Sequence, residues 1–255
     1  MLEILDHDGG VRELRLARPP VNALDPALVR TLIDALAEAP RAGARSLVLS
    51  SAQPGLFSAG LDVPALLALD RTAMGDFLTD FFALMRGLAA SPIPTVAAIS
   101  GHSPAGGAVL AIHCDYRVMA AGAFKIGMNE VQVGLPLPES IHMVLARVVG
   151  VRQAERLGTF GLLISADEAA AIGLVDELVA PESVVPRALE LARAYLALPP
   201  TVMARTRAMC RRDLVEAFDR LSAGTLERFL DDWFSAETRG ALTALVERLA
   251  AKKKG

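Results

Sequence analysis

The sequence predicts an α/β fold in which short strands alternate with helices, followed by a region made of helices alone. Two apolar runs of strand length, "RSLVLSS" (45–51) and "PTVAAIS" (94–100), each lead through small residues into a stretch with helical periodicity. Beyond Pro199-Pro200, by contrast, the apolar residues recur only at helical spacing. At 255 residues with 53% hydrophobic residues, the chain is long enough to bury a large core.

The first elements are a hairpin and a helix. Residues 2–18 alternate apolar and polar side chains on both sides of Asp8-Gly9-Gly10, which predicts a β-hairpin. The stretch 21–39 contains a predicted helix, which begins with Pro26 in its first position and Asp25 as its N-cap. Further along, we expect a helix over 70–89 and then short strands within 115–121 and 123–127.

From about residue 139 the pattern becomes mainly helical. Helices are expected over 139–150, 151–160, 165–173 and from about Pro181, with one short strand within 174–184; beyond Pro200 they are expected at roughly 201–222, 223–236 and 238–251. The last three helices carry more large apolar residues than they can bury among themselves. We therefore expect them to pack on the main domain or on another subunit. The closing "AKKKG" predicts a solvated tail.

Charge and composition exclude several classes of protein. A formal net charge of -3 provides no basic field for binding nucleic acid. No apolar stretch reaches the roughly 18 residues of a membrane span, and the acidic N-terminus is unlike a signal or transit peptide, so we expect a cytoplasmic protein. Cys114 and Cys210 match no metal spacing and are expected to be buried free thiols.

The stretch "AISGHSPAGGAVLA" (98–111) requires a backbone with little side-chain cover, and phosphate binding is one interpretation. Phosphate loops and dinucleotide loops have fixed glycine spacings, which Gly101, Gly106 and Gly107 do not match. No lysine lies near them. Phosphate binding is therefore disfavoured.

A serine nucleophile is the second interpretation of the same stretch, because "GHSPA" is close to the G-x-S-x-G elbow of α/β-hydrolases. That elbow uses the backbone N–H of the residue after the serine, and the residue after Ser103 is Pro104, which has none. The downstream histidines, His113 and His142, stand in apolar helical settings that are typical of packing. The hydrolase interpretation therefore fails.

The third interpretation is a helix beginning near Gly106 whose first-turn N–H groups face an anion. These groups have no partner within the helix and lie at its positive end, so they suit an oxygen that becomes negative during a reaction, such as an enolate oxygen. Glycines that serve close helix–strand packing are the alternative. A second loop, "PGLFSAGLDV" (54–63), again places small residues at a strand-to-helix junction, which favours the ligand interpretation.

Glu130 supplies a candidate base. It follows a glycine-marked strand, and its neighbours Met128, Val131 and Val133 are apolar. Apolar surroundings would raise its pKa toward the range of a useful base. A solvated surface carboxylate is the alternative.

Four motifs, in this order along the chain, resemble the enoyl-CoA hydratase/isomerase (crotonase) superfamily: "FSAGLD" (57–62), "PAGGAVLAIHCDYRVM" (104–119), "IGMNEVQVGL" (126–135) and the run over 152–179. Within the superfamily, they look most like the mitochondrial-type Δ3,Δ2-enoyl-CoA isomerases. The resemblance implies a spiral of β-β-α turns over 1–198 that holds the site. It also implies a C-terminal helical region over 199–255 that forms a homotrimer or a dimer of trimers.

The resemblance also implies the substrate and the site. The substrate would be an acyl-CoA thioester; no separate cofactor is implied, because coenzyme A is part of the substrate, and no metal is implied. The thioester oxygen would lie between the backbone N–H groups of Ala59 and Gly106, and Glu130 would be the catalytic glutamate. The residues expected to contact the substrate or its CoA part are Ala59, Gly60, Leu61, Asp62, Val63 and Asn129.

One position distinguishes the reactions of this superfamily. Its hydratases carry a second glutamate three residues past the oxyanion glycine, where this chain has Val109, which cannot exchange a proton. Moving a double bond from C3 to C2 requires one base only, so we expect an isomerase of unsaturated fatty acyl-CoA in β-oxidation. The alternatives are a hydratase or another crotonase reaction, and a non-catalytic acyl-CoA-binding protein. Glu139 is expected at the surface or as a helix cap, but would restore a second acid if it pointed into the pocket.

Overall fold

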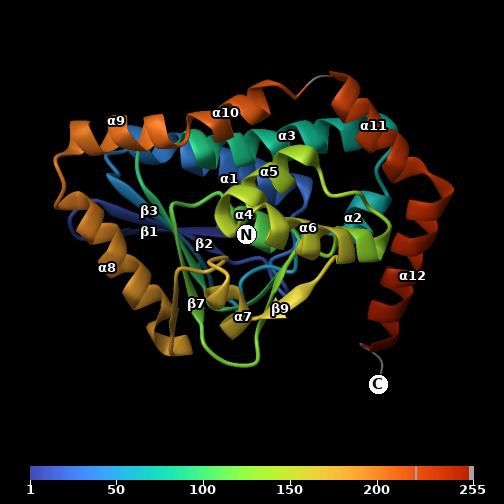
Figure 1. Cartoon of the computed structure of the whole chain (residues 1–255), viewed down its shortest axis with the longest axis horizontal. Helices are drawn as coiled ribbons and strands as arrows, with labels where there is room; N and C mark the ends of the chain where they lie inside the picture. Colours follow the sequence, from blue (N-terminus) through green and yellow to red (C-terminus); the bar gives the residue numbers. More distant parts are fainter. Residues whose placement is uncertain (222, 253–255) are drawn as a thin grey trace.

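The computed structural model describes residues 1–221 and 223–252, and Figure 1 shows its strands at the centre with helices around them. The predicted solvated tail lies largely outside the described residues. A six-stranded sheet has the order β1-β2-β3-β5-β7-β10, and a four-stranded sheet has the order β4-β6-β8-β9. The strands of the larger sheet are β1 (Leu2–His7), β2 (Val11–Leu16), β3 (Ser46–Ser51), β5 (Thr95–Ile99), β7 (Tyr116–Ala120) and β10 (Glu177–Val179). Those of the smaller sheet are β4 (Gly55–Leu56), β6 (Gly101–Pro104), β8 (Lys125–Gly127) and β9 (Leu163–Ser165).

Each successive turn of the chain adds one strand to the larger sheet and one strand to the smaller sheet. The chain places β3, β5 and β7 in the larger sheet, and each is followed directly by a strand of the smaller sheet: β4, β6 and β8. Neighbouring strands are parallel except in the pairs β1–β2 and β8–β9. Helices follow each strand pair, which confirms the expected α/β spiral of β-β-α turns.

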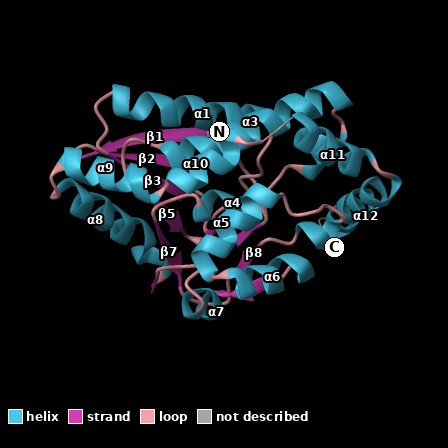
Figure 2. Cartoon of the chain, turned by 45° about the horizontal axis from the view of Figure 1, so that its top comes forward, coloured by secondary structure: helices cyan, strands magenta, loops and turns pink. Residues whose placement is uncertain are grey.

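Helices fill the connections and the C-terminal part of the chain. Figure 2 shows α1 and α3 side by side along one edge of the molecule. The helices before residue 135 are α1 (Pro26–Arg41), α2 (Val63–Leu67), α3 (Arg71–Ala90), α4 (Gly106–Ile112) and the 3-10 helix η1 (Glu130–Val133). Those after it are α5 (Glu139–Val149), α6 (Val151–Phe160), α7 (Ala166–Ala171), the 3-10 helix η2 (Pro181–Ser183), α8 (Val184–Leu196), α9 (Pro200–Cys210), α10 (Arg212–Asp219), α11 (Ala223–Phe234) and α12 (Ala236–Lys252).

The predicted hairpin and first helix are confirmed in detail. His7 pairs with Val11 across the turn, and Gly9 and Gly10 adopt φ angles of 83° and 89°, which only glycine adopts readily. Asp25 caps α1 by accepting a hydrogen bond from the Leu28 N–H at 2.8 Å. Local chain chemistry is therefore sufficient to set these elements.

Three strands of the smaller sheet were not predicted. Residues 55–56 and 101–104, interpreted as loops, form β4 and β6, and residues 163–165 form β9 immediately before α7. Each has only two to four residues, which is too short for a period of two to appear in the sequence. Pairing with distant strands defines them.

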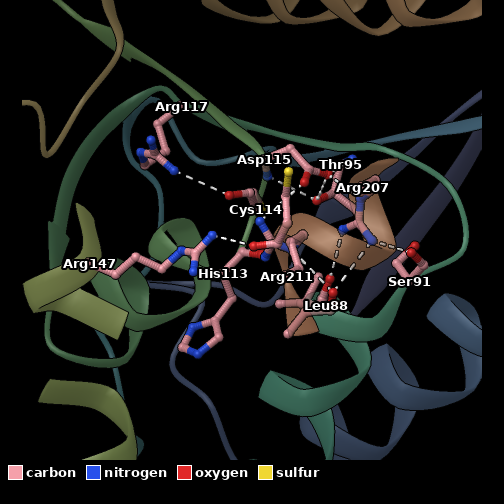
Figure 3. Close-up of polar contacts among 12 residues, drawn as sticks. Leu88, Ser91, Thr95, His113, Cys114, Asp115, Arg117, Arg147, Arg207 and Arg211 are labelled. Atoms are coloured by element: carbon pink, nitrogen blue, oxygen red, sulfur yellow. Dashed lines mark hydrogen bonds and ion pairs between the residues drawn. The ribbon is translucent and has the colours of Figure 1, made fainter. Parts of the chain in front are cut away.

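The long helix predicted over 201–222 is wrong, because the chain breaks into α9 and α10 at Arg211. The Arg211 guanidinium turns back to the carbonyl oxygens of Ala89 and His113, at the ends of α3 and α4. Arg207 pairs with Asp115 at 2.9 Å beside it, as Figure 3 shows. These charged contacts satisfy helix-end carbonyl groups and hold the C-terminal helices on the main part of the chain.

Several large apolar residues of the C-terminal helices are buried within the same chain, although Val202, Met209 and Leu249 are exposed. Helices α10 and α11 pack on α3, and Phe218, Leu230, Trp233 and Leu242 are all buried. This confirms packing on the main domain; packing on another subunit stays a prediction. No helix in the described part of the chain is both long and apolar enough to cross a bilayer.

Candidate active site

Three backbone segments meet at one place: the loop 57–62 before α2, the turn 104–107 before α4, and residues 127–130 leading into η1. The Ala105 N–H donates to the Gly127 carbonyl at 2.8 Å, which joins the second segment to the third. A Cβ placed on Gly60 would lie 3.0 Å from the Gly106 nitrogen, so the first and second segments are in direct contact. The strand-to-helix loops singled out in the sequence therefore form one site.

Asn22 shapes the first of these segments, and the sequence analysis missed it. The residue is fully buried with a φ of 48°, and its side-chain amide donates to the Phe57 carbonyl at 3.0 Å. The Ser58 hydroxyl donates back to the Asn22 carbonyl at 2.7 Å. The signal was an asparagine between apolar residues in "VNALD", since buried asparagine needs partners and tolerates positive φ.

The structure contradicts one of the two expected backbone donors. The N–H of Ala59 donates to the Val21 carbonyl at 3.0 Å, so it is not available to a ligand. Leu24 binds the residues on either side of Leu61, accepting from the Asp62 N–H and donating to the Gly60 carbonyl. Within the described ranges, no acceptor takes the N–H of Leu61 or the N–H of Gly106.

The two free N–H groups are neighbours. A Cβ on Gly106 would lie 3.2 Å from the Gly60 Cα and 3.4 Å from the Gly60 carbonyl carbon, to which the Leu61 nitrogen is bonded. Both glycines are therefore needed for this close approach, and Gly60 also has a φ of 86°. The pair that can bind a developing oxyanion is Leu61 and Gly106.

Asp62 stabilises the loop around these donors. One carboxylate oxygen accepts from the Ala65 N–H at 3.1 Å, which caps α2, and the other pairs with Arg18 at 2.7 Å. Arg18 also pairs with Asp25 at 2.9 Å and so joins α1 to α2. Contact of Asp62, Gly60, Leu61 or Val63 with CoA stays a prediction.

Glu130 begins η1 and has the properties expected of a base. Its Oε2 atom is buried, and no other described residue donates a hydrogen bond to it. Burial raises its pKa from 4.5 to about 7, against a smaller opposing effect of a hydrogen bond from its own backbone. Asn129 beside it also has a buried, unpartnered Oδ1 within the described chain. The pair has unused polar capacity that a ligand can satisfy.

The neighbouring candidates take structural roles. Val109 is 1% exposed in α4 and supplies no ionisable group. Glu139 is an exposed first residue of α5, and Pro138 occupies the capping position, so the surface interpretation is confirmed and the capping one is wrong. His113 is buried, which lowers its pKa to about 4, and its Nδ1 lies 2.6 Å from the Val109 carbonyl oxygen.

Thiols and metal ligands add nothing to this site. Cys114 is buried as expected, but Cys210 is exposed, so that part of the thiol prediction is wrong. Across residues 1–221 and 223–252, no three His, Cys, Asp or Glu side chains gather closely enough to hold a metal ion.

Known proteins resemble the chain over nearly its whole length. Residues 6–254 match the enoyl-CoA hydratase/isomerase family model. The human mitochondrial enoyl-CoA delta isomerase 1 is 30% identical over 97% of this chain and 83% of its own length. A probable enoyl-CoA hydratase of Mycobacterium tuberculosis is 35% identical over 79% of this chain and 77% of its own.

Solved structures agree with this. The crystal structure of human mitochondrial delta3-delta2-enoyl-CoA isomerase superposes with a TM-score of 0.95 at 30% identity, covering 99% of each chain. With the spiral fold, the paired donors and the buried glutamate all present in one site, the chain belongs to the enoyl-CoA hydratase/isomerase family.

Proposed function

We propose that this protein is a Δ3,Δ2-enoyl-CoA isomerase, which converts 3-enoyl-CoA thioesters to 2-enoyl-CoA thioesters. The observation that carries the proposal is the Glu130 carboxylate, whose buried Oε2 atom has no partner among the described residues, in the same site as the N–H groups of Leu61 and Gly106, which no described acceptor takes. A pKa of about 7 lets one carboxyl group act both as base and as acid near neutral pH.

The proposed reaction uses these groups in two proton transfers. The Glu130 carboxylate removes a proton from C2 of the substrate, and the electron pair moves into the thioester to form a dienolate. The Leu61 and Gly106 N–H groups hold its oxyanion, and each such donor contributes about 3 kcal/mol in comparable sites. The protonated Glu130 then delivers the same proton to C4, which leaves the double bond between C2 and C3 and regenerates the carboxylate.

Two residues disfavour hydration as the main reaction. A hydratase benefits from a second acid or base, and Val109 stands where the hydratases of this family carry one. The other candidate, Glu139, is exposed on α5 instead of buried beside Glu130. A single buried carboxylate is sufficient for isomerisation.

A spectroscopic assay tests the proposal. We expect trans-3-hexenoyl-CoA to be converted to the conjugated 2-enoyl thioester, which absorbs in the ultraviolet, with a rate that falls 10²–10⁴-fold in Glu130→Gln. Glu139→Gln is the matched control, because it makes the same change on an exposed carboxylate, and it should keep full activity.

Three outcomes would contradict the proposal. Equal turnover in Glu130→Gln would exclude Glu130 as the base. Hydration of crotonyl-CoA at a rate comparable to isomerisation would indicate a hydratase. Tight binding of CoA thioesters without any turnover would indicate a binding protein.

A further inference from the structure

Two consecutive residues in the first turn of α12 contact two elements that flank the candidate site, η1 and α2. The Thr238 hydroxyl donates to the Gly134 carbonyl at 2.5 Å, directly after η1. Both terminal nitrogens of Arg239 donate to the Leu67 carbonyl at 3.1 Å, at the end of α2. Figure 1 shows α12 along the edge of the molecule beside α2, and it also packs on η1.

Gly134 ends the short turn that carries Glu130. Its N–H donates to the Val131 carbonyl at 3.2 Å, and the next residue, Leu135, donates to the Glu130 carbonyl at 3.0 Å. A 3-10 turn of four residues has few internal hydrogen bonds, so its orientation depends on what holds its ends. The orientation of the Gly134 peptide is therefore coupled to that of Glu130.

Contact between α12 and this peptide is close. A Cβ on Gly134 would lie 3.1 Å from the Ala241 Cβ and 3.3 Å from the Thr238 Cα, and Gly134 has a φ of 78°. Only glycine fits both the conformation and the space. The helix thus rests on the bare backbone of Gly134, which lets the Thr238 hydroxyl reach the carbonyl.

Thr238 is itself fixed. It is 3% exposed, and its backbone N–H donates at 3.2 Å to the hydroxyl of Ser235, which precedes α12. A second side-chain hydrogen bond, from the Gln132 amide to the Phe160 carbonyl, also restrains this turn. It is longer, at 3.3 Å, and solvent-exposed. Of these two hydrogen bonds, the one from Thr238 is the less exposed.

We propose that Thr238 is a positioning residue for Glu130, acting through the Gly134 carbonyl. Through this contact, α12 keeps Glu130 in place next to the loop 57–62, which carries the Leu61 N–H group. The role of Glu130 in this statement rests on the proposed function. Loss of the hydroxyl would free the turn, misplace the carboxylate and admit water beside it. Small misplacements of a catalytic group reduce the rate steeply, and hydration of the carboxylate returns its pKa toward 4.5.

Thr238→Val removes the hydroxyl while keeping the side-chain shape, and Thr238→Ser restores it. We expect Thr238→Val to lower kcat about tenfold with little change in KM. We also expect it to move the acidic limb of the pH profile of kcat/KM below pH 7. Thr238→Ser should stay within about twofold of the wild type. The control is Thr31→Val on α1, which removes a comparable hydroxyl-to-carbonyl bond outside the site.

A wild-type kcat and pH profile in Thr238→Val would overturn the proposal, as would a lowered melting temperature with both unchanged. If valine prevents folding, Thr238→Ala is measured in its place with the same expectations. Carbon-13 NMR titration of the Glu130 carboxyl in wild type and variant uses no substrate. A lower pKa in the variant supports the positioning role even if 3-enoyl-CoA is not turned over, and an unchanged pKa contradicts it.

Discussion

The larger sheet and the 3-10 helix η1 each carry one glutamate whose carboxylate is shielded from solvent. The pKa values of these two glutamates shift in opposite directions. Glu13 on β2 is fully buried, and burial alone would raise its pKa. Hydrogen bonds from Arg15, Ser50 and His7 outweigh this and lower the pKa below 4.5. Glu130 on η1 has no such partners among the described residues, and burial raises its pKa to about 7.

The contacts explain the difference. Arg15 donates to both oxygens of Glu13, at 2.8 and 3.2 Å, and Ser50 donates to one at 2.5 Å. His7 lies 2.8 Å from the other. Burial of a carboxylate therefore does not by itself make a base. The partners decide whether the group is a structural anion or a reactive one.

The largest expected effect that tests this comparison is the pH dependence of activity. If Glu130 is the base with a pKa of about 7, kcat/KM should fall about tenfold for each pH unit below 7, or about 100-fold at pH 5. A base surrounded like Glu13 would already be ionised at pH 5 and would give a flat profile over this range. Steady-state kinetics from pH 5 to pH 9 distinguish the two.

Stability should show the same contrast. Between pH 4.5 and about 7 the folded state holds the Glu130 proton more tightly than the unfolded state does, so ionisation reduces stability as the pH rises. The difference between these pKa values corresponds to at most about 3 kcal/mol. At pH 8 we expect Glu130→Gln to have a higher free energy of unfolding than wild type, by up to about 3 kcal/mol, as measured by chemical denaturation.

At pH 4.5 the free energy of unfolding of Glu130→Gln should differ from that of wild type by close to zero. Comparing variant with wild type at each pH also cancels the contribution of His113, whose lowered pKa has the opposite effect on stability over a similar range. A constant difference at both pH values would mean that the carboxyl does not titrate in this window.

Glu13 should respond in the opposite sense. Glu13→Gln removes the charge that Arg15 and Ser50 bind, and we expect it to lower the free energy of unfolding by about 2 kcal/mol at pH 7. Catalytic rates per folded molecule should be unchanged, because Glu13 lies on the central strand β2 and not on the site turn. Chemical denaturation and the isomerase assay on the same sample measure both.

The part of the site that could be predicted from the sequence is the part that depends on local chemistry. Glu130 could be proposed as a base because it follows a glycine-marked strand and stands among apolar residues, and the structure agrees with the direction of its pKa shift. The helix start at Gly106 is confirmed for the same reason. Asp25 and the Gly9-Gly10 turn likewise follow from capping and turn preferences.

Long-range pairing accounts for what could not be predicted. Ala59 was expected to be a free donor, but the Val21 carbonyl, far away in the sequence, takes its N–H and leaves that of Leu61 free. The strand β6 exists because β4 and β8 flank it. The break at Arg211 depends on carbonyl groups at the ends of α3 and α4. No local pattern encodes these partners.

Glu139 completes the comparison with the smallest expected effect. Its side chain is exposed, so replacing the carboxylate with an amide removes no buried contact. We expect Glu139→Gln to change stability by less than about 0.5 kcal/mol and isomerase activity by less than about twofold. A loss of activity near that of Glu130→Gln would mean that α5 turns this carboxylate into the site when substrate binds. In that case Val109 would no longer distinguish an isomerase from a hydratase, because a second acid would be available from another helix.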